Sequence, residues 1–252
     1  MHKKLSFLGI IPARYASTRF PGKPLVDIGG KTMIQRVYEQ ASQSLSEVYI
    51  ATDDARIEKA VSDFNGKVIM TSDLHKSGTD RCSEALIKIV QKTGHNFDVV
   101  VNIQGDEPFI QPEQINKLIQ CFDDPATDIA TLVMVVKDSK DLFNPNHVKV
   151  VLNKSKKALY FSRSIIPYIR NIEQDKWAES YNYLKHIGIY AYKSSVLKEI
   201  TNLSSSSLEM AESLEQNRWL ENGYTIRTEL TEYESYSIDS PEDLENVKKK
   251  FL

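Results

Sequence analysis

The sequence predicts an α/β protein whose core is a mostly parallel, doubly wound β-sheet. Residues 5–11 are apolar apart from Ser6 and show no polar alternation, which is typical of a parallel strand buried on both faces. After residue 32, apolar side chains recur at helical spacing, at Met33, Ile34, Val37 and Ala41. Strand and helix patterns alternate in this way through the first half. This order implies right-handed crossovers with helices on both faces of the sheet.

The remaining elements follow in chain order. In the first half we expect strands at 47–51, 68–70 and 98–103, and helices at 55–64, 80–90 and 112–122. The second half is less regular, with strands expected at 129–136, 148–152, 159–164, 183–192 and 225–230, and helices at 208–221 and from 241. The polar segment 171–179 is interpreted as a loop or a short helix. Ligands of such sheets bind beyond the carboxyl ends of the strands.

Length and charge limit the classes of function. A chain of 252 residues suits a single domain over 1–252, with a smaller excursion at about 135–200. The formal net charge of −2 gives no global basic field, so we do not expect nucleic acid as a partner. Any binding of anions must therefore depend on a local group of cations.

Cysteine usage and hydropathy bear on the compartment. Cys82 and Cys121 have no metal-binding spacing and indicate no disulfide framework, which fits a reducing compartment. No apolar run approaches the roughly 18 residues of a membrane span. The N-terminal segment is interpreted as a buried strand and not as a signal peptide. We therefore expect a soluble protein without a membrane partner.

A basic loop follows the first strand. Residues 12–24 contain Arg14, Arg19 and Lys23, and no acid appears before Asp27. Small residues let a triphosphate approach the backbone amides, while the cations neutralise its charge. These small residues are Ala13, Ala16 and Ser17. The alternative is a solvated charged loop, but the absence of a compensating acid favours anion binding.

A second glycine-containing stretch resembles the end of a P-loop. Gly30-Lys31-Thr32 matches the last residues of GxxxxGK[ST], but the first glycine of that pattern should stand where the chain has Leu25. We therefore predict a plain turn into a helix at this point.

The segment from Ser77 to Arg81 has the pattern of a helix start. Ser77 and Asp80 form a capping-box pattern. Arg81 then lies in the first turn, where the helix dipole disfavours a cation unless an anion is close by. Two interpretations stay open: an anionic ligand near Arg81, or an ion pair between Arg81 and Asp80 or Glu84.

Two aspartates stand where ligand-binding side chains are expected. Asp106 follows the apolar run at 98–103, and Pro108 prevents an immediate helix. Asp239 precedes the last helix, but Ser240 is the natural N-cap and Asp243 its partner, so Asp239 is left without a capping role. Each aspartate alone is more often a turn residue. Together they can hold Mg²⁺ with water and phosphate oxygens, which points to nucleotidyl transfer.

Eight segments, in order along the chain, together resemble one known family. They are IIPARYASTRFPGKPL, MTSDLHKSGTDR, VNIQGDEPFI, HVKVVLN, ALYFSRSIIPY, LKHIGIYAY, LEMAESLEQNRWLENGY and IDSPEDLENV. The family is that of 3-deoxy-manno-octulosonate cytidylyltransferase, also called CMP-Kdo synthetase. The resemblance covers nearly the whole chain and is weakest at about 165–182.

The resemblance implies a fold, an activity and a cellular setting. The fold is of the nucleotide-diphospho-sugar transferase type, and the excursion at 135–200 would serve sugar binding and dimerisation. The activity is transfer of CMP from CTP to the anomeric hydroxyl of 3-deoxy-D-manno-octulosonate (Kdo), with release of pyrophosphate, for lipopolysaccharide biosynthesis. Members are cytoplasmic, Mg²⁺-dependent and typically homodimeric.

The resemblance also implies roles for individual residues. Arg14 and Lys23 would hold the triphosphate and stabilise the charge of the leaving pyrophosphate. Arg81 would lie beside the nucleotide, and Asp106 and Asp239 would bind Mg²⁺. Backbone groups of the two loops that contain Ala13, Ser17, Ser77 and Gly78 would recognise cytosine.

A sugar that carries a carboxylate and many hydroxyls needs a cation among polar groups. The motifs suggest these candidates: Gln104, Arg163, His186, Tyr190, Glu212 and Gln216. Glu212 and Gln216 stand four residues apart, so we expect them on one face of the helix 208–221. Four of these candidates have a plainer interpretation: His186 as a satisfied strand residue, Tyr190 as core packing, and the Glu212–Gln216 pair as a solvated face.

Other functions stay open at this point. A cytidylyltransferase for sialic acid shares the chemistry, although the QGDEP, FSR and HIGIY motifs favour Kdo. The amino derivative 8-amino-Kdo is harder to separate from Kdo. A catalytically silent nucleotide-binding protein would have lost Lys23 or a metal aspartate, and both kinds of residue are present.

Overall fold

The computed structural model describes residues 4–251, which form two compact units. Unit 1 consists of residues 4–116, Ala191–Thr201 and 235–251, and unit 2 of Lys117–Tyr190 and Asn202–Glu234. Helix α4 (Pro112–Gln120) and strand β10 (Leu184–Lys193) run from one unit into the other. The two units are described one at a time.

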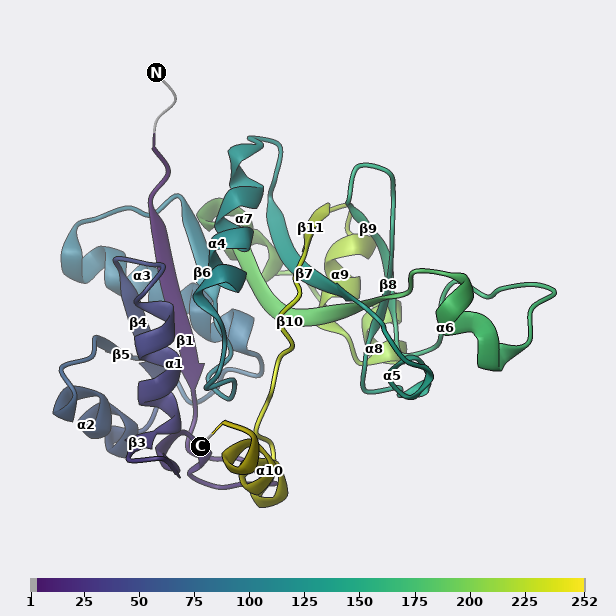
Figure 1. Ribbon diagram of the computed structural model, residues 1–252. Helices are drawn as coiled ribbons and strands as arrows, with labels where there is room; N and C mark the ends of the chain where they lie inside the picture. The colour runs from purple at the N-terminus through teal and green to yellow at the C-terminus, as the bar shows by residue number, and fades with distance from the viewer. Residues whose placement is uncertain (1–3, 252) are drawn as a thin grey trace. The chain divides into compact units, whose positions relative to one another are not determined.

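Unit 1 contains a parallel sheet with the strand order β6-β1-β4-β5 (Figure 1). These strands are β1 (Phe7–Ala13), β4 (Val48–Thr52), β5 (Val68–Met70) and β6 (Val99–Asn102). Every residue of β4 and β6 is buried, as expected of apolar strands that helices cover on both faces. The predicted α/β class and the doubly wound parallel order of the first half are confirmed.

The helices of unit 1 begin where the sequence offers caps. They are α1 (Met33–Ala41), α2 (Ala55–Asp63), α3 (Gly78–Thr93) and the short α7 (Ser194–Ile200). Thr32 accepts a hydrogen bond from the Gln35 amide, and Asp54 accepts one from the Arg56 amide. Helix α1 packs against β1 and β4, whereas α3 and α7 pack against β6 and each other.

The order of the strands reverses beside β1. From β1 the chain proceeds through β4 to β5 on one side, and then returns to place β6 on the other side. The loops that leave β1 and β6 therefore emerge side by side at the carboxyl edge, at the topological switch point where such sheets bind ligands. The 3₁₀ helix η1 (Lys23–Leu25) and the small hairpin of β2 (Asp27–Ile28) and β3 (Lys31–Thr32) follow β1.

The hairpin decides between the two interpretations of Gly30-Lys31-Thr32. Gly29 and Gly30 have φ angles of 59° and 80°, which form the turn between β2 and β3, and Thr32 caps α1. The prediction of a plain turn into a helix is confirmed.

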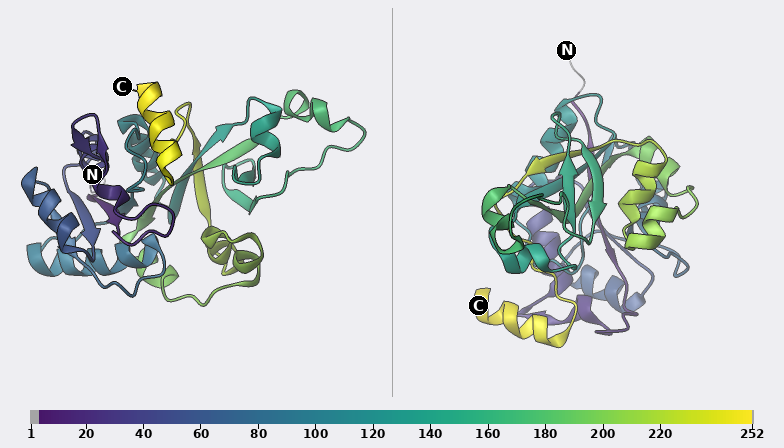
Figure 2. Two further views of the ribbon diagram at one scale, coloured as in Figure 1. Left: turned by 90° about the horizontal axis from the view of Figure 1, so that it is seen from below. Right: turned by 90° about the vertical axis from the view of Figure 1, so that its right-hand side faces the viewer.

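The last helix closes unit 1. Helix α10 (Pro241–Phe251) packs Leu244 and Val247 against a cluster that contains Ile28, Met33 and Ile238. Figure 2 shows α10, in yellow, beside the purple N-terminal region. The hydrophobic contact fixes the chain just before α10, where Asp239 lies.

Unit 2 contains mixed strands. They are β7 (Ile129–Val135), β8 (Lys149–Leu152), β9 (Ala158–Ser162), β11 (Ile226–Leu230) and residues 184–190 of β10. Strand β11 pairs with β7 in parallel, and β8 pairs antiparallel with both β9 and β10. The helical segments are η2 (Cys121–Asp123), α5 (Ser139–Phe143), η3 (Gln174–Lys176), α6 (Trp177–Ser180), α8 (Ser207–Glu212) and α9 (Glu215–Glu221).

One predicted helix of unit 2 is wrong. The segment 208–221 is not a single helix, because α8 ends at Glu212 and α9 begins at Glu215. Ser213 between them has φ 52°, in the left-handed region that ends a helix. Glu212 and Gln216 therefore do not lie on one helical face. The short helices α5 and α7 are additional to the predicted elements.

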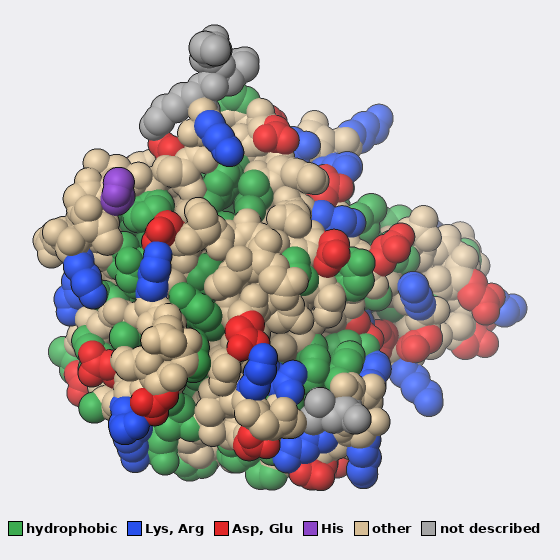
Figure 3. Space-filling view, turned by 60° about the vertical axis from the view of Figure 1, so that its left-hand side comes forward, with side chains coloured by type: hydrophobic (Ala, Val, Ile, Leu, Met, Phe, Trp, Pro, Cys, Tyr) green, Lys and Arg blue, Asp and Glu red, His purple; other side chains and the backbone are tan. Residues whose placement is uncertain are grey.

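The distribution of charge and the character of the helices both agree with the composition. On the face drawn in Figure 3, acidic and basic side chains lie in small intermingled groups. No helix within residues 4–251 has both the length and the apolar character needed to cross a membrane.

Candidate active site

A pocket of about 360 Å³ lies in unit 1 at the switch point of its sheet. Its walls come from the loop after β1, the start of α3, the turn after β6 and the chain before α10. The residues that line it are Pro12, Ala13, Arg14, Ala16, Ser17, Thr18, Arg19, Lys23, Pro24, His75, Lys76, Ser77, Gly78, Arg81, Gln104, Gly105, Asp106 and Asp239. All the predicted nucleotide-binding and metal-binding residues, together with Gln104, line this pocket.

Lys23 brings the two aspartates together. Its Nζ lies 2.7 Å from Asp106 Oδ2 and 3.0 Å from Asp239 Oδ1, and it also donates to the Ile238 carbonyl at 3.3 Å. Burial by itself would lower the pKa of Lys23, but the charges and hydrogen bonds of the two carboxylates outweigh it, so the pKa is raised. Lys23 is therefore a charged ammonium between two carboxylates.

The basic loop has fewer unpaired cations than the sequence suggested. Arg19 Nη2 lies 3.1 Å from Asp239 Oδ1, so two of the three cations have acidic partners from distant parts of the chain. No acid stands near these cations in the sequence, but the fold brings Asp106 and Asp239 next to them. Arg14 is exposed on the pocket wall, where it can meet a phosphate.

Close backbone packing positions the loop after β1, the start of α3 and the turn after β6 relative to one another. A Cβ atom on Gly105 would lie 2.8 Å from the Pro12 carbonyl oxygen, and one on Gly78 would lie 3.3 Å from Pro12 Cγ. The Ile238 amide donates to the Asp106 carbonyl at 2.9 Å, which ties the chain before α10 to the turn after β6. Glycine at position 105 lets the two loops approach each other at the switch point.

The helix caps are as predicted. Ser77 and Asp80 form a complete capping box at α3. At α10, Ser240 Oγ accepts from the Asp243 amide, and Asp243 Oδ2 accepts from the Ser240 amide. The Asp239 carboxylate is thus left to contact Lys23 and Arg19.

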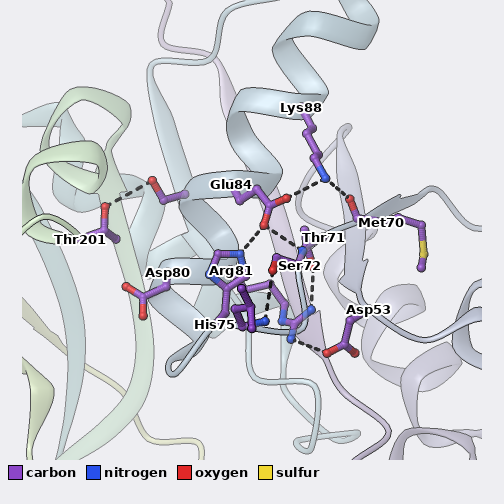
Figure 4. Close-up of polar contacts among 12 residues, drawn as sticks. Asp53, Met70, Thr71, Ser72, His75, Asp80, Arg81, Glu84, Lys88 and Thr201 are labelled. Carbon is purple, nitrogen blue, oxygen red and sulfur yellow. Dashed lines mark hydrogen bonds and ion pairs between the residues drawn. The ribbon is translucent and has the colours of Figure 1, made fainter.

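Arg81 is buried, and its ion pair differs from both predicted pairs (Figure 4). Its Nη2 lies 3.0 Å from Asp53 Oδ2, and its Nη1 donates to Thr71 Oγ1 at 2.6 Å. The alternative interpretation, a pairing with Asp80 or Glu84, is wrong, because the side chain turns toward the ends of β4 and β5. The aspartate that pairs with Arg81 lies 28 positions earlier, where the sequence gives no local signal.

His75 is a pocket residue that the sequence reasoning missed. Its Nε2 contacts Glu84 Oε2, which also accepts from the Ser72 amide (Figure 4). Burial opposes ionisation of Glu84, but Lys88, Ser72 and His75 outweigh it and lower its pKa to about 2. A signal was present, since His75 stands only two residues before Ser77, the N-cap of α3.

The candidate sugar-binding residues other than Gln104 lie in unit 2. Glu212 is the centre of one group, and accepts from Ser162 Oγ at 2.6 Å, from Tyr160 OH at 3.2 Å and from the Arg163 amide at 2.9 Å. Burial opposes ionisation of Glu212, but these hydrogen bonds and the Arg163 charge lower its pKa. The Arg163 Nε donates to the Glu212 carbonyl at 2.7 Å.

A second group lies around His186. Its Nε2 is 3.0 Å from Thr131 Oγ1, and its ring centroid is 5.2 Å from that of Tyr190. Burial lowers the pKa of His186 to about 3, so the imidazole is neutral at physiological pH. Tyr190 also packs edge-on against Trp219, and Gln216 is buried.

Comparisons with known proteins identify the family of the chain. The family model for cytidylyltransferases matches residues 8–226. A 3-deoxy-manno-octulosonate cytidylyltransferase of Parabacteroides distasonis is 61% identical, with 96% of this chain and 97% of that protein covered. The Escherichia coli protein of the same name is 48% identical, with 95% and 93% covered.

The chain belongs to the 3-deoxy-manno-octulosonate cytidylyltransferase family. As a member of it, the chain is a nucleotidyltransferase enzyme.

Solved structures support the same family and fold. CMP:2-keto-3-deoxy-manno-octonic acid synthetase complexed with CTP matches with a TM-score of 0.89 and 46% identity, over 97% of this chain and 98% of that one. A glucose-1-phosphate thymidylyltransferase from Bacillus anthracis, described as putative, matches at 17% identity and a TM-score of 0.62, which indicates a shared fold alone. The predicted nucleotide-diphospho-sugar transferase type of fold is confirmed.

Proposed function

We propose that this enzyme transfers CMP from CTP to the anomeric hydroxyl of Kdo and releases pyrophosphate. The observation that carries the proposal is the pocket of unit 1, where Lys23, Asp106 and Asp239 meet beside Arg14. The relatives named for this activity, and the related structure that contains CTP, support the choice of substrates. The sugar oxygen attacks the α-phosphorus directly, so no protein nucleophile is needed.

The cations of the pocket are suited to a nucleoside triphosphate. Arg14 is exposed and can bind phosphate oxygens without losing a partner carboxylate. Lys23 already donates to three acceptors, so it would exchange one of them for a phosphate oxygen. Both side chains would then stabilise the negative charge that develops on the departing pyrophosphate.

The nucleoside would lie against the two loops at the pocket rim. Arg81 is held rigidly by Asp53 and Thr71, so it would contribute a fixed positive charge beside the nucleotide. Backbone groups near Ala13, Ser17, Ser77 and Gly78 would recognise cytosine. Tight packing of Gly78 against Pro12 favours such recognition, because a rigid backbone discriminates between bases better than a mobile one.

Asp106 and Asp239 fit the requirements of Mg²⁺. Both carboxylates reach the same ammonium, so a cation between them is already favoured by the fold. Mg²⁺ usually takes one or two carboxylates, with water and substrate phosphates as its other ligands. A bound Mg²⁺ would supply charge neutralisation on the phosphates of CTP. We therefore propose Mg²⁺ as the cofactor.

Residues of unit 2 would bind the sugar acid. Arg163 supplies a cation for its carboxylate, while Glu212 and its hydroxyl partners suit sugar hydroxyls. Neutral His186 and Tyr190 would add hydrogen bonds and an aromatic surface. Buried Gln216, and Gln104 from the pocket of unit 1, complete the set of sugar-binding candidates.

We further propose that the enzyme is a cytoplasmic homodimer that serves lipopolysaccharide biosynthesis. Several large apolar side chains of the excursion at 135–200 are exposed, which supports a role for this segment in self-association. They include Phe143, Leu159, Tyr168, Ile172 and Tyr181. Light scattering of the purified protein tests the dimer directly.

One assay tests the proposed reaction. Pyrophosphate release is measured with CTP and Kdo, and then with sialic acid or 8-amino-Kdo in place of Kdo. UTP, ATP and GTP replace CTP in matched reactions. We expect CTP with Kdo to be the best pair, and faster turnover of sialic acid than of Kdo would contradict the proposal.

A further inference from the structure

Lys149 is a fully buried lysine in unit 2, with none of its surface exposed. It lies on β8, directly opposite Ser162 of β9 and Lys185 of β10. Directly opposed residues of antiparallel strands place their side chains on the same face of a sheet. The row of Ser162, Lys149 and Lys185 therefore lies on one face, and it contains two buried lysines.

The two lysines have different partners. Lys185 Nζ lies 2.7 Å from Asp141 Oδ2 and 2.8 Å from Glu234 Oε1, so its charge is fully compensated. Lys149 Nζ donates to the Asn144 carbonyl at 2.9 Å, and no carboxylate within residues 4–251 forms an ion pair with it. Burial lowers the pKa of Lys149, whereas the carboxylates outweigh burial and raise the pKa of Lys185.

A buried ammonium without a paired carboxylate is unfavourable for folding. An apolar side chain of similar length would fill the same space without this cost. Lys185, the other buried lysine of this row, has two acidic partners that offset this cost. The charge of Lys149 therefore needs an explanation outside stability.

A second cation, Arg163, contacts the same short segment of chain as Lys149. Arg163 Nη1 donates to the Pro145 carbonyl at 3.3 Å, so the two cations contact adjacent peptide groups. The Arg163 guanidinium hydrogen-bonds to backbone carbonyls, and the Glu212 carboxylate is occupied by two hydroxyls and an amide. Glu212 attracts the Lys149 ammonium and Arg163 repels it. One carboxylate thus faces two cations.

We infer that Lys149 is a specificity-determining residue, whose buried charge, together with that of Arg163, selects a sugar substrate that carries a carboxylate. This inference rests on the proposed function and deepens it, because it assigns the recognition of the acid group. Lys149 acts on the carboxylate through its electric field, which is strong where the surroundings are poorly polarisable. A sugar without a charged group would gain no binding energy from this field.

The test compares Lys149→Met with Lys185→Met. For Lys149→Met we expect KM for Kdo to rise about tenfold, equivalent to about 1.4 kcal/mol, while KM for CTP stays unchanged. Its Tm should be equal to that of the wild type or higher. Lys185→Met should instead lower Tm, because two carboxylates lose their shared cation. With a neutral amide of Kdo, the wild type and Lys149→Met should show the same KM.

The wild-type assay with Kdo judges the proposed function, and the variants judge this inference. An unchanged KM for Kdo in folded Lys149→Met would overturn the inference. So would a tenfold rise that persists with the neutral amide, because the effect would not depend on the carboxylate. If Lys149→Met and Lys149→Gln both fail to fold, Lys149 has a structural role and the inference is wrong.

Discussion

At the scale of single residues, the site depends on two aspartates whose carboxylates cap no helix. Asp239 precedes a helix whose cap is supplied by Ser240 and Asp243, so its carboxylate is available for a cation. Asp106 is likewise held outside any helix, in the turn after β6. Substitutions at these two positions can therefore separate chemistry from folding.

The first prediction concerns this pair of aspartates. Asp239→Asn keeps the shape of the side chain but removes one negative charge, so we expect turnover to fall by about 10²–10⁴. Tm should change little, because the cap of α10 remains. Asp106→Asn should behave alike, and the double variant should lose much less than the product of the single losses. The measurement is turnover as a function of Mg²⁺ concentration. Multiplying losses with unchanged Mg²⁺ dependence would mean that the aspartates act separately.

The second prediction concerns Arg163. Removal of a cation from a desolvated contact with the Kdo carboxylate should weaken Kdo binding by about 2–5 kcal/mol. Arg163→Ala should leave CTP binding unchanged, since its contacts all lie within unit 2. Isothermal titration with each substrate checks this, with exposed Arg170→Ala as the control. Equal loss of both substrates would assign Arg163 to the structure.

At the scale of elements, the loop before α3 is held by one carboxylate of that helix. Glu84 contacts Lys88 at 2.6 Å, the Ser72 amide at 2.9 Å and the ring of His75 (Figure 4). Lys88 in turn donates to the Met70 carbonyl at 2.9 Å. The end of β5, the loop and α3 are thereby joined through a single ionised group.

The third prediction is a pH dependence that follows from Glu84. Its folded pKa of about 2 lies below the ordinary value of 4.5, so the folded state favours the ionised form. The resulting stability is fully present above pH 4.5 and is lost as the pH falls from 4.5 toward 2. Glu84→Gln should thus be less stable than the wild type at pH 7, by roughly 1–3 kcal/mol. Denaturant unfolding at pH 7, 4 and 3 checks this, and a difference that does not shrink with acidification would contradict it.

Elements with strong local signals were predictable from the sequence, and others were not. Strand β5 was predicted at its observed bounds, and the capping box of α3 at its observed residues. The break between α8 and α9 could not be foreseen, because Ser213 adopts a left-handed conformation that usually signals glycine. The partner of Arg81 was missed because Asp53 is distant in sequence, and pairing across strands depends on register.

The candidate site was likewise only partly predictable from the sequence. Motifs identified its cationic and acidic members, since residue type and position after a strand are visible in the sequence. They did not show that Lys23 pairs with both aspartates, or that Lys149 is buried and has no ion-paired carboxylate among residues 4–251. Burial and pairing are properties of the folded chain, so they become visible only in the structure.

At the scale of the whole molecule, binding of substrate should raise stability. A ligand that binds the folded state alone stabilises it by about 2.7 kcal/mol at a concentration of 100 times Kd. The pocket of unit 1 draws its walls from four separate segments of the chain, so its ligand links them. The effect should therefore be seen in global unfolding.

The fourth prediction is a thermal shift that is selective for CTP. We expect CTP with Mg²⁺ to raise Tm by several degrees, and UTP to raise it less. Lys23→Ala should abolish most of the shift, because the triphosphate loses a cation. Lys31→Ala is the matched control, since Lys31 is an exposed neighbour that pairs with Glu39 outside the pocket. Equal shifts for both variants would contradict the assignment of the pocket.

The close approach of Gly105 to Pro12 has a consequence for how freely the sequence can vary. Any side chain at position 105 would place its Cβ 2.8 Å from a backbone oxygen, and a backbone oxygen cannot move aside as a flexible side chain can. In a saturation library selected for activity, position 105 should tolerate no replacement, even alanine. Gly30, where a Cβ would meet nothing within 4 Å, should accept asparagine in its turn. Position 105 is therefore restricted to glycine, because even one added methyl group would push apart the two loops that meet there.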